Sequence, residues 1–217
     1  MKIYNIPQHL EDGTANPEWL SVRAGKFTAS DFHQYMAIVE KGKLSDSVET
    51  ALHKKVLQGL GEQFDSYKSE SMERGNELEP IAREMYIQET FNDVQEVGFV
   101  DWEQLRTGVS PDGVIYGADG KIEKIVELKS PETVAYIKYA RGVENIPPLY
   151  RTQVQMQMLV TGAKSCDFVA YHPNMRLVVY TIDADADYQA KIVAALEKLN
   201  TRYDEILETI NKLKIEV

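Results

Sequence analysis

The chain contains 217 residues, with a formal net charge of −10 and a single cysteine, Cys166. This length suits a single domain, and we expect one unit over residues 1–217. The lone cysteine excludes an internal disulfide and a cysteine-based zinc site, and it suits a reducing cytoplasm. The negative charge argues against a protein that coats nucleic acid through a broadly basic surface, but it is compatible with an enzyme that encloses DNA in a local basic channel.

No stretch of the sequence is long and apolar enough for a membrane helix, and the first residues lack the layout of a secretory signal. Apolar residues make up 43% of the chain, which is enough for a substantial core. We therefore expect a cytoplasmic protein without membrane contact.

Helical patterns dominate the first ninety residues. A proline begins the first helix, and Thr28 to Asp31 predict the cap of a second, short one. Asp46 and Glu49 have the spacing of a capping box for the third helix. In the fourth, Pro80 is expected in the first turn or at a kink. The expected helices span residues 17–23, about 32–36, 46–59 and 72–88.

The remainder of the chain mixes strand and helix patterns. The expected strands span about 94–101, 107–116, 122–129, 166–171 and 177–182. The expected helices lie near 133–140, over 148–160, and in a long amphipathic segment that follows the acidic residues 183–185. This order predicts an α/β fold with a mixed central β-sheet flanked by helices and a long C-terminal helix.

The most informative residues for function are Asp112, in a Ser-Pro-Asp-Gly turn, and Glu127 with Lys129 in the strand pattern over 122–129. Side chains two apart on a strand share a face, so Glu127 and Lys129 lie together while Leu128 points the other way. Two carboxylates beside an ammonium can hold Mg²⁺ and orient a water for attack on phosphate. This is the chemistry of a metal-dependent nuclease.

Within such a site, Lys129 could orient or deprotonate the water, or balance negative charge. Glu79, on the helix that precedes the strands, could complete a second metal position. The same residues also fit a hairpin turn and a solvated strand face, and their spacing alone does not choose between these interpretations.

Five sequence blocks, in order, resemble the lambda exonuclease family of phage recombination nucleases, also called the YqaJ-like viral recombinases, which belong to the restriction-enzyme-like superfamily. The blocks are residues 19–30, 74–83, 110–113, 127–131 and 153–155. The resemblance implies a restriction-endonuclease-like fold with its catalytic core over about residues 17–182.

The resemblance also implies a role for each matching position. Asp112 and Glu127 correspond to the metal-binding carboxylates, and Leu128 contributes its backbone carbonyl. Lys129 corresponds to the catalytic lysine, and Glu79 to the carboxylate associated with a second metal ion. The implied cofactor is Mg²⁺, with Mn²⁺ as a substitute, and two ions in each active site.

A second group of positions lies around this centre. Gln153 matches a catalytic glutamine beside the active site, with a helix-surface amide as the alternative. Arg23, Ser30 and Ser110 match residues that engage the 5′-terminal phosphate of DNA, which suits a guanidinium fork and neutral hydroxyl donors. Ser30 could instead cap a helix, and Ser110 could only shape its turn.

The resemblance implies a Mg²⁺-dependent exonuclease of phage or prophage origin in a bacterial host cell. It would digest one strand of linear double-stranded DNA in the 5′-to-3′ direction, release 5′-mononucleotides and leave a 3′ overhang. Family membership further implies a toroidal homotrimer that passes the overhang to a single-strand annealing protein. The alternatives are a related structure-specific or single-strand-specific endonuclease and a non-catalytic DNA-end-binding protein.

Overall fold

The computed structural model describes residues 1–10, 12–64 and 70–213, with the backbone alone for residues 70–72. The α-helices are α1 (Pro17–Arg23), α2 (Ala37–Glu40), α3 (Asp46–Gly59), α4 (Glu70–Thr90), α5 (Thr133–Tyr139), α6 (Pro148–Thr161) and α7 (Ala186–Leu213), with 3-10 turns η1 (Phe32–Met36) and η2 (Val143–Asn145). The strands are β1 (Lys2–Tyr4), β2 (Phe27–Thr28), β3 (Phe99–Asp101), β4 (Thr107–Val109), β5 (Gly113–Tyr116), β6 (Ile122–Lys129), β7 (Ser165–Ala170) and β8 (Val178–Asp183).

The described strands form two four-stranded sheets, in the orders β1-β3-β4-β2 and β5-β6-β7-β8. Each sheet is mixed: β2 pairs with β4 and β6 pairs with β7 in parallel, while the other neighbours are antiparallel. The α/β class, the mixed strand pairing and the long C-terminal helix are thus confirmed. The expected single central sheet is instead divided into two.

The division occurs within the strand expected over residues 107–116. Its first part, β4, belongs to one sheet and its second part, β5, to the other, with Ser110 to Asp112 between them. Pro111 interrupts the ladder because it has no N–H to donate. Gly113 then allows a close approach, since a Cβ there would lie 2.5 Å from Val94 Cγ1. Asp112 is therefore held at the entry to β5.

The strand expected over residues 94–101 is also shorter than predicted, because only Phe99–Asp101 forms β3. Gln95 makes one isolated bridge with Val114 of the other sheet. The N-terminal strand β1, which pairs with β3, was not predicted. Its three residues are too few to show a periodic pattern.

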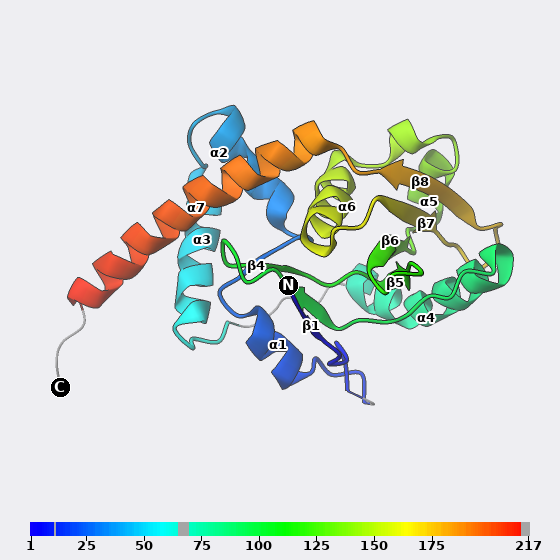
Figure 1. Ribbon diagram of the computed structural model, residues 1–217, viewed down its shortest axis with the longest axis horizontal. Helices are drawn as coiled ribbons and strands as arrows, with labels where there is room; N and C mark the ends of the chain where they lie inside the picture. Colours follow the sequence, from blue (N-terminus) through cyan, green and yellow to red (C-terminus); the bar gives the residue numbers. More distant parts are fainter. Residues whose placement is uncertain (11, 65–69, 214–217) are drawn as a thin grey trace.

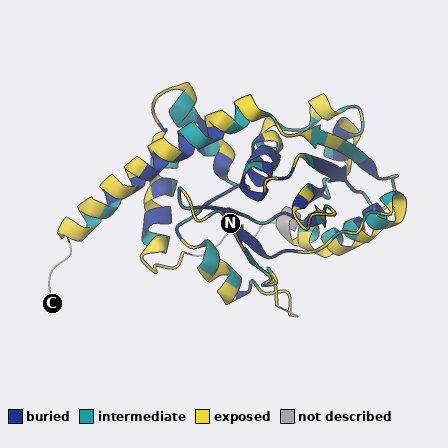
Figure 2. Ribbon diagram, in the orientation of Figure 1, coloured by how far each residue is buried: buried dark blue, intermediate teal, exposed yellow. Residues whose placement is uncertain are grey.

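Helices α4 and α6 cover opposite faces of the sheet that contains β6 (Figure 1). Val126 and Leu128 point toward α4, where they pack with Ala82 and Tyr86. Ile125 belongs to the core cluster on the other face, to which α6 contributes. Figure 2 shows α6 buried around almost its whole circumference. Consecutive residues of β6 therefore face two different environments.

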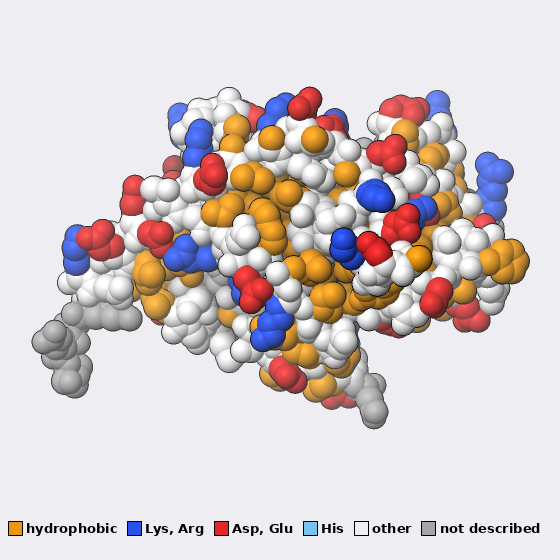
Figure 3. Space-filling view, in the orientation of Figure 1, with side chains coloured by type: hydrophobic (Ala, Val, Ile, Leu, Met, Phe, Trp, Pro, Cys, Tyr) orange, Lys and Arg blue, Asp and Glu red, His pale blue; other side chains and the backbone are white. Residues whose placement is uncertain are grey.

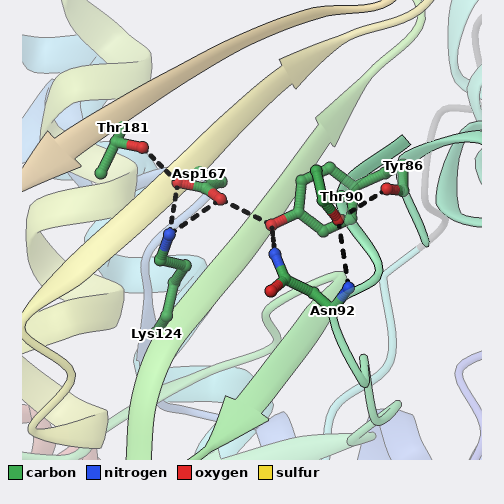
Figure 4. Close-up of polar contacts among 6 residues, drawn as sticks. All are labelled: Tyr86, Thr90, Asn92, Lys124, Asp167 and Thr181. Atoms are coloured by element: carbon green, nitrogen blue, oxygen red, sulfur yellow. Dashed lines mark hydrogen bonds and ion pairs between the residues drawn. The ribbon is translucent and has the colours of Figure 1, made fainter. Parts of the chain in front are cut away.

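A buried polar network anchors α4 to this sheet, and Figure 4 shows its members. Asp167 on β7 is 3% exposed and accepts hydrogen bonds from Tyr86 Oη at 2.5 Å, from Lys124 Nζ at 3.0 Å and from Thr181 Oγ1 at 2.7 Å. Asn92, just beyond α4, donates to the same Tyr86 hydroxyl at 2.8 Å. We call these five residues the Asp167 network; it joins α4 to strands β6, β7 and β8.

Helix α7 crosses the molecule and its last turns extend beyond the other elements (Figure 1). Its apolar stripe, predicted over residues 192–213, is confirmed from Ile192 to Ile206, where its members are buried, but not at its end, where Leu213 is 76% exposed. The acidic start is also confirmed as a cap, because Asp185 Oδ1 accepts from the backbone N–H of Tyr188 at 3.0 Å.

Two local predictions were wrong, and a third was wrong in part. Helix α3 has Ser45 as its N-cap and no side-chain capping bond, so Asp46 and Glu49 form no capping box and lie instead in the first helical turn. Asp31 precedes η1 without capping it, because its carboxylate accepts from the Thr28 hydroxyl. Pro80 does not lie in the first turn of α4, because that helix begins at residue 70, and the alternative of a kink at Pro80 stays a prediction.

Charge of both signs covers the surface. On the face shown in Figure 3, Lys and Arg side chains are interspersed with Asp and Glu rather than gathered by sign. Among the helices that the structure describes, none combines the length and the apolar character needed to cross a membrane.

Candidate active site

Strand β6 presents Glu127 and Lys129 on the same face, as its alternation predicts. The Glu127 side chain is fully buried, and its Oε1 forms an ion pair with Lys129 Nζ. Leu128 between them packs on the α4 side. The adjoining parallel strand places Phe168 beside Glu127. A carboxylate in such a position must be hydrogen-bonded or paired to be tolerated.

Helix α6 supplies two amide donors to this carboxylate. Gln153 Nε2 lies 2.5 Å from Glu127 Oε1, and Gln157 Nε2 lies 2.8 Å from Glu127 Oε2. The two glutamines are four residues apart and therefore share a helix face. Gln153 was predicted beside the site, but Gln157 was not. Its i+4 spacing from Gln153 was the available signal.

Asp112 reaches the same region from the entry to β5. Its Oδ2 accepts from the backbone N–H of Leu128 at 2.7 Å, which fixes the turn against β6. Burial, followed by the nearby Glu127 carboxylate, raises the pKa of Asp112 well above its ordinary value, while Lys129 opposes this change. Glu79 adds a further repulsive charge. The site thus concentrates negative charge around Asp112.

Glu79 is held at the site by Arg83, which the i+4 spacing places on the same face of α4. Arg83 Nη2 lies 2.6 Å from Glu79 Oε1, one helical turn away on α4. The same guanidinium donates to the backbone oxygen of Asp112 at 3.2 Å and pairs with Glu96 at 2.9 Å. Burial raises the pKa of Glu79, whereas Arg83 and then Lys129 lower it. Arg83 therefore connects α4 to the turn that carries Asp112.

Lys129 is the cation at the centre of these carboxylates. Its Nζ also lies 5.3 Å from the centre of the Tyr150 ring, within the range of a cation–π contact. Burial would lower the pKa of Lys129, but Glu127 and Asp112 raise it above its ordinary value. The charged form of the lysine is favoured by these two neighbours.

These oxygen donors fit a divalent cation. Asp112 and Glu127 are hard ligands of the kind that Mg²⁺ prefers, and Asp112 uses only Oδ2 in its bond to Leu128. The like-charge repulsion that raises the pKa of Asp112 is what a bound cation would relieve. Within the described residues, no three acidic, histidine or cysteine side chains converge into a ready ligand set.

The predicted phosphate-binding residues have different surroundings. The Arg23 guanidinium stacks 3.8 Å from the Trp19 ring centre, and burial lowers its pKa to about 10 against the opposing charge of Asp31. Ser30 is exposed. Ser110 Oγ is buried and, among the described residues, has no hydrogen-bond partner. No hydrogen bond in the described structure joins Arg23 or Ser30 to the carboxylate cluster, so their roles stay predictions.

Comparison with known proteins gives a consistent result. The model of the YqaJ-like viral recombinase domain matches residues 18–164, a range that contains all the predicted site residues. No curated protein matches the chain. Among solved structures, an alkaline exonuclease (LHK-Exo) from Laribacter hongkongensis is 31% identical with a TM-score of 0.73, over 92% of this chain and 100% of that chain.

Two further structures are similar. LHK-Exo in complex with dAMP matches with 31% identity and a TM-score of 0.72, over 92% of this chain and 100% of that chain. A phage-related exonuclease from Haemophilus somnus 129PT is 16% identical with a TM-score of 0.69, over 85% of this chain and 96% of that chain. At 16% identity, the similarity to the Haemophilus somnus exonuclease shows a shared fold alone.

Proposed function

The chain belongs to the family of YqaJ-like viral recombinases, and from this premise we propose that it is a Mg²⁺-dependent DNA exonuclease. It digests one strand of linear duplex DNA from the 5′ end and leaves a 3′ overhang. The observation that carries the proposal is the cluster of Asp112, Glu127 and Lys129, which is buried against α6 and crowded with negative charge.

The protein's own groups have separable tasks in this proposal. Asp112, Glu127 and the Leu128 carbonyl would hold Mg²⁺, and the charged amine of Lys129 would donate a hydrogen bond to the attacking water or to the phosphate. Gln153 holds the Glu127 carboxylate through Oε1. When bound there, Mg²⁺ supplies positive charge against the charge that develops on phosphate and lowers the pKa of water. Glu79 serves a second cation.

The released product is a 5′-mononucleotide, because the bond broken is that between phosphorus and the 3′ oxygen of the terminal nucleotide. The complex of LHK-Exo with dAMP supports this part of the proposal, since that relative binds a mononucleotide. Arg23, Ser30 and Ser110 anchor the 5′-phosphate. The buried, unpaired hydroxyl of Ser110, two residues before Asp112, supports a donor role for it.

An assay of three DNA substrates tests the proposal. The substrates are linear duplex with 5′-phosphate ends, the same duplex with 5′-hydroxyl ends, and covalently closed circles, each with Mg²⁺ and with chelator. We expect Mg²⁺-dependent release of mononucleotides at full rate from the 5′-phosphorylated duplex, and slower release or none from the other two substrates. Digestion of circles at a similar rate would identify an endonuclease instead. DNA-end binding without hydrolysis would identify a binding protein.

Family membership also leads us to propose a homotrimer and a single-strand annealing partner in a phage or prophage setting. The chain is acidic overall, and on the face in Figure 3 its charges of both signs are interspersed, so that face offers no broad basic surface to DNA. A ring would instead enclose the DNA in a central path. The mass of the assembly in solution tests the oligomer.

A further inference from the structure

The buried Glu127 carboxylate is held at both oxygens from one helix. Gln153 and Lys129 donate to Oε1, and Gln157 donates to Oε2 at 2.8 Å. Among the hydrogen bonds of the described residues, the Gln157 bond is the one that engages Oε2. Because Glu127 is fully buried, water cannot replace a lost donor without a change in the packing.

Gln157 is a poor choice for stability alone. Its side chain is 1% exposed, and its own Oε1 is buried without a hydrogen-bond partner among the described residues. A buried amide with one unsatisfied half costs folding free energy, and a leucine or methionine of similar volume would avoid that cost. The amide donor is therefore the property that this position uses.

Gln155, on the same helix, provides the contrast. It is equally buried, but its Nε2 donates to the Asp183 backbone oxygen at 2.8 Å and its Oε1 accepts from the Asp185 backbone N–H at 2.8 Å. Both halves of this amide are satisfied by the junction between β8 and α7. Gln155 has the contacts of a structural residue, and Gln157 does not.

We propose that Gln157 is a positioning residue that fixes the rotamer of Glu127, so that this carboxylate is held in the orientation in which it would bind a cation together with Asp112. Without the amide, Oε2 loses its donor and the carboxylate is free to turn about its last side-chain bond. Gln153 and Lys129 alone restrain one oxygen. The proposal rests on the proposed function, because it assigns Glu127 to a cation.

The test compares Gln157→Leu with the matched control Gln155→Leu. The first readout is direct binding of Mg²⁺ and of Ca²⁺ to the folded protein without DNA, measured by calorimetry and by the cation-induced rise in Tm. The second is kcat and the Mg²⁺ concentration for half-maximal rate on 5′-phosphorylated duplex. Loss of an outer-sphere partner of a ligating carboxylate typically weakens metal binding or activity by about 10- to 100-fold.

We expect Gln157→Leu to show a loss of that size in both readouts with little change in KM for DNA. Both variants should lower Tm without cation, because Gln157→Leu removes a donor to a buried carboxylate and Gln155→Leu leaves two backbone groups unpaired. Gln155→Leu should bind Mg²⁺ like the wild type. Equal cation affinity in the two variants would overturn the proposal.

Gln157→Met guards against a folding defect, since it keeps an unbranched chain of similar length. If both Gln157 variants fail to fold while Gln155→Leu folds, Gln157 is structural and the proposal is wrong. A wild-type protein that binds no Mg²⁺ and hydrolyses no DNA would instead refute the proposed function.

Discussion

Two buried carboxylates on neighbouring strands have opposite surroundings. Asp167 on β7 faces α4, and Glu127 on β6 faces α6, on the other side of the same sheet. Asp167 is surrounded by an ammonium and two hydroxyls, whereas Glu127 shares one ammonium with the carboxylates of Asp112 and Glu79. The two carboxylates are thus similarly buried, but donors surround Asp167 whereas further negative charges surround Glu127.

The difference distinguishes the Asp167 network, which stabilises its own carboxylate, from the candidate active site, which does not. Burial acts against ionisation of Asp167, but hydrogen bonds from Tyr86, Thr181 and Lys124 hold its pKa below the ordinary value. At Asp112, burial and like charge act together and raise the pKa. Excess negative charge that the protein does not neutralise is typical of a site that awaits a cation or reacts.

The largest effect on activity should follow from removing the Lys129 ammonium, which the three carboxylates share. Lys129→Ala is expected to lower kcat by roughly 10³-fold or more, because it removes the charge beside the reacting phosphate but leaves both carboxylates. DNA affinity and the circular dichroism spectrum should stay close to those of the wild type. Turnover near the wild-type rate would show that Lys129 is a structural partner of Glu127.

Asp112→Asn should separate function from stability. We expect activity to fall by roughly 10²- to 10³-fold, because a hard anionic ligand becomes a neutral amide. Without cation, Tm should rise, because the raised pKa of Asp112 means that its ionised form is disfavoured in the folded chain. If the Tm of Asp112→Asn in chelator were lower than that of the wild type, the interpretation of the site as one with excess negative charge would be wrong.

Asp167→Asn should have the opposite profile. It should reduce the free energy of unfolding at neutral pH by about 1–3 kcal/mol. This figure is modest because the Lys124 side chain is 27% exposed, so that water screens its charge. The kcat of the folded enzyme should be nearly unchanged. Chemical denaturation and single-turnover rates measure the two quantities. Thr181→Val, which removes one donor, is the milder control.

The same variant gives a pH test of the Asp167 network. Because the folded pKa of Asp167 is lowered, its ionised form stabilises the fold above the unfolded pKa of about 3.9. That contribution is lost as the pH falls through the folded value. The stability difference between wild type and Asp167→Asn should therefore close in acid. A constant difference from pH 7 to pH 2 would show that the charge is not responsible.

The smallest effect concerns a residue outside both carboxylate sites. Arg23→Ala should reduce the preference for 5′-phosphate over 5′-hydroxyl ends by roughly 10-fold, the value of one charge-assisted contact, with a similar kcat at saturating DNA. Rates on the two ends, measured side by side, give the ratio. If both ends slow equally, Arg23 has a structural role through its stacking on Trp19.

Local patterns predicted the elements that carry the chemistry. Strand β6 was placed at its observed bounds because its alternation and flanking turns are properties of the chain itself. Helix α6 was predicted to within one residue, since Pro148 and Gly162 mark its two ends. The pairing of Glu127 with Lys129 followed from the two-residue period alone.

The sequence by itself thus determined which residues share a strand face or a helix face, as Glu127 and Lys129 do on β6 and Gln153 and Gln157 do on α6. Tertiary structure alone decided that Ser110 to Asp112 pass between two sheets, that Arg83 joins Glu79 to the Asp112 turn, and that the α6 face with Gln153 and Gln157 meets Glu127. Those contacts depend on how elements far apart in the chain pack, and local periodicity carries no information about the partner of a given face.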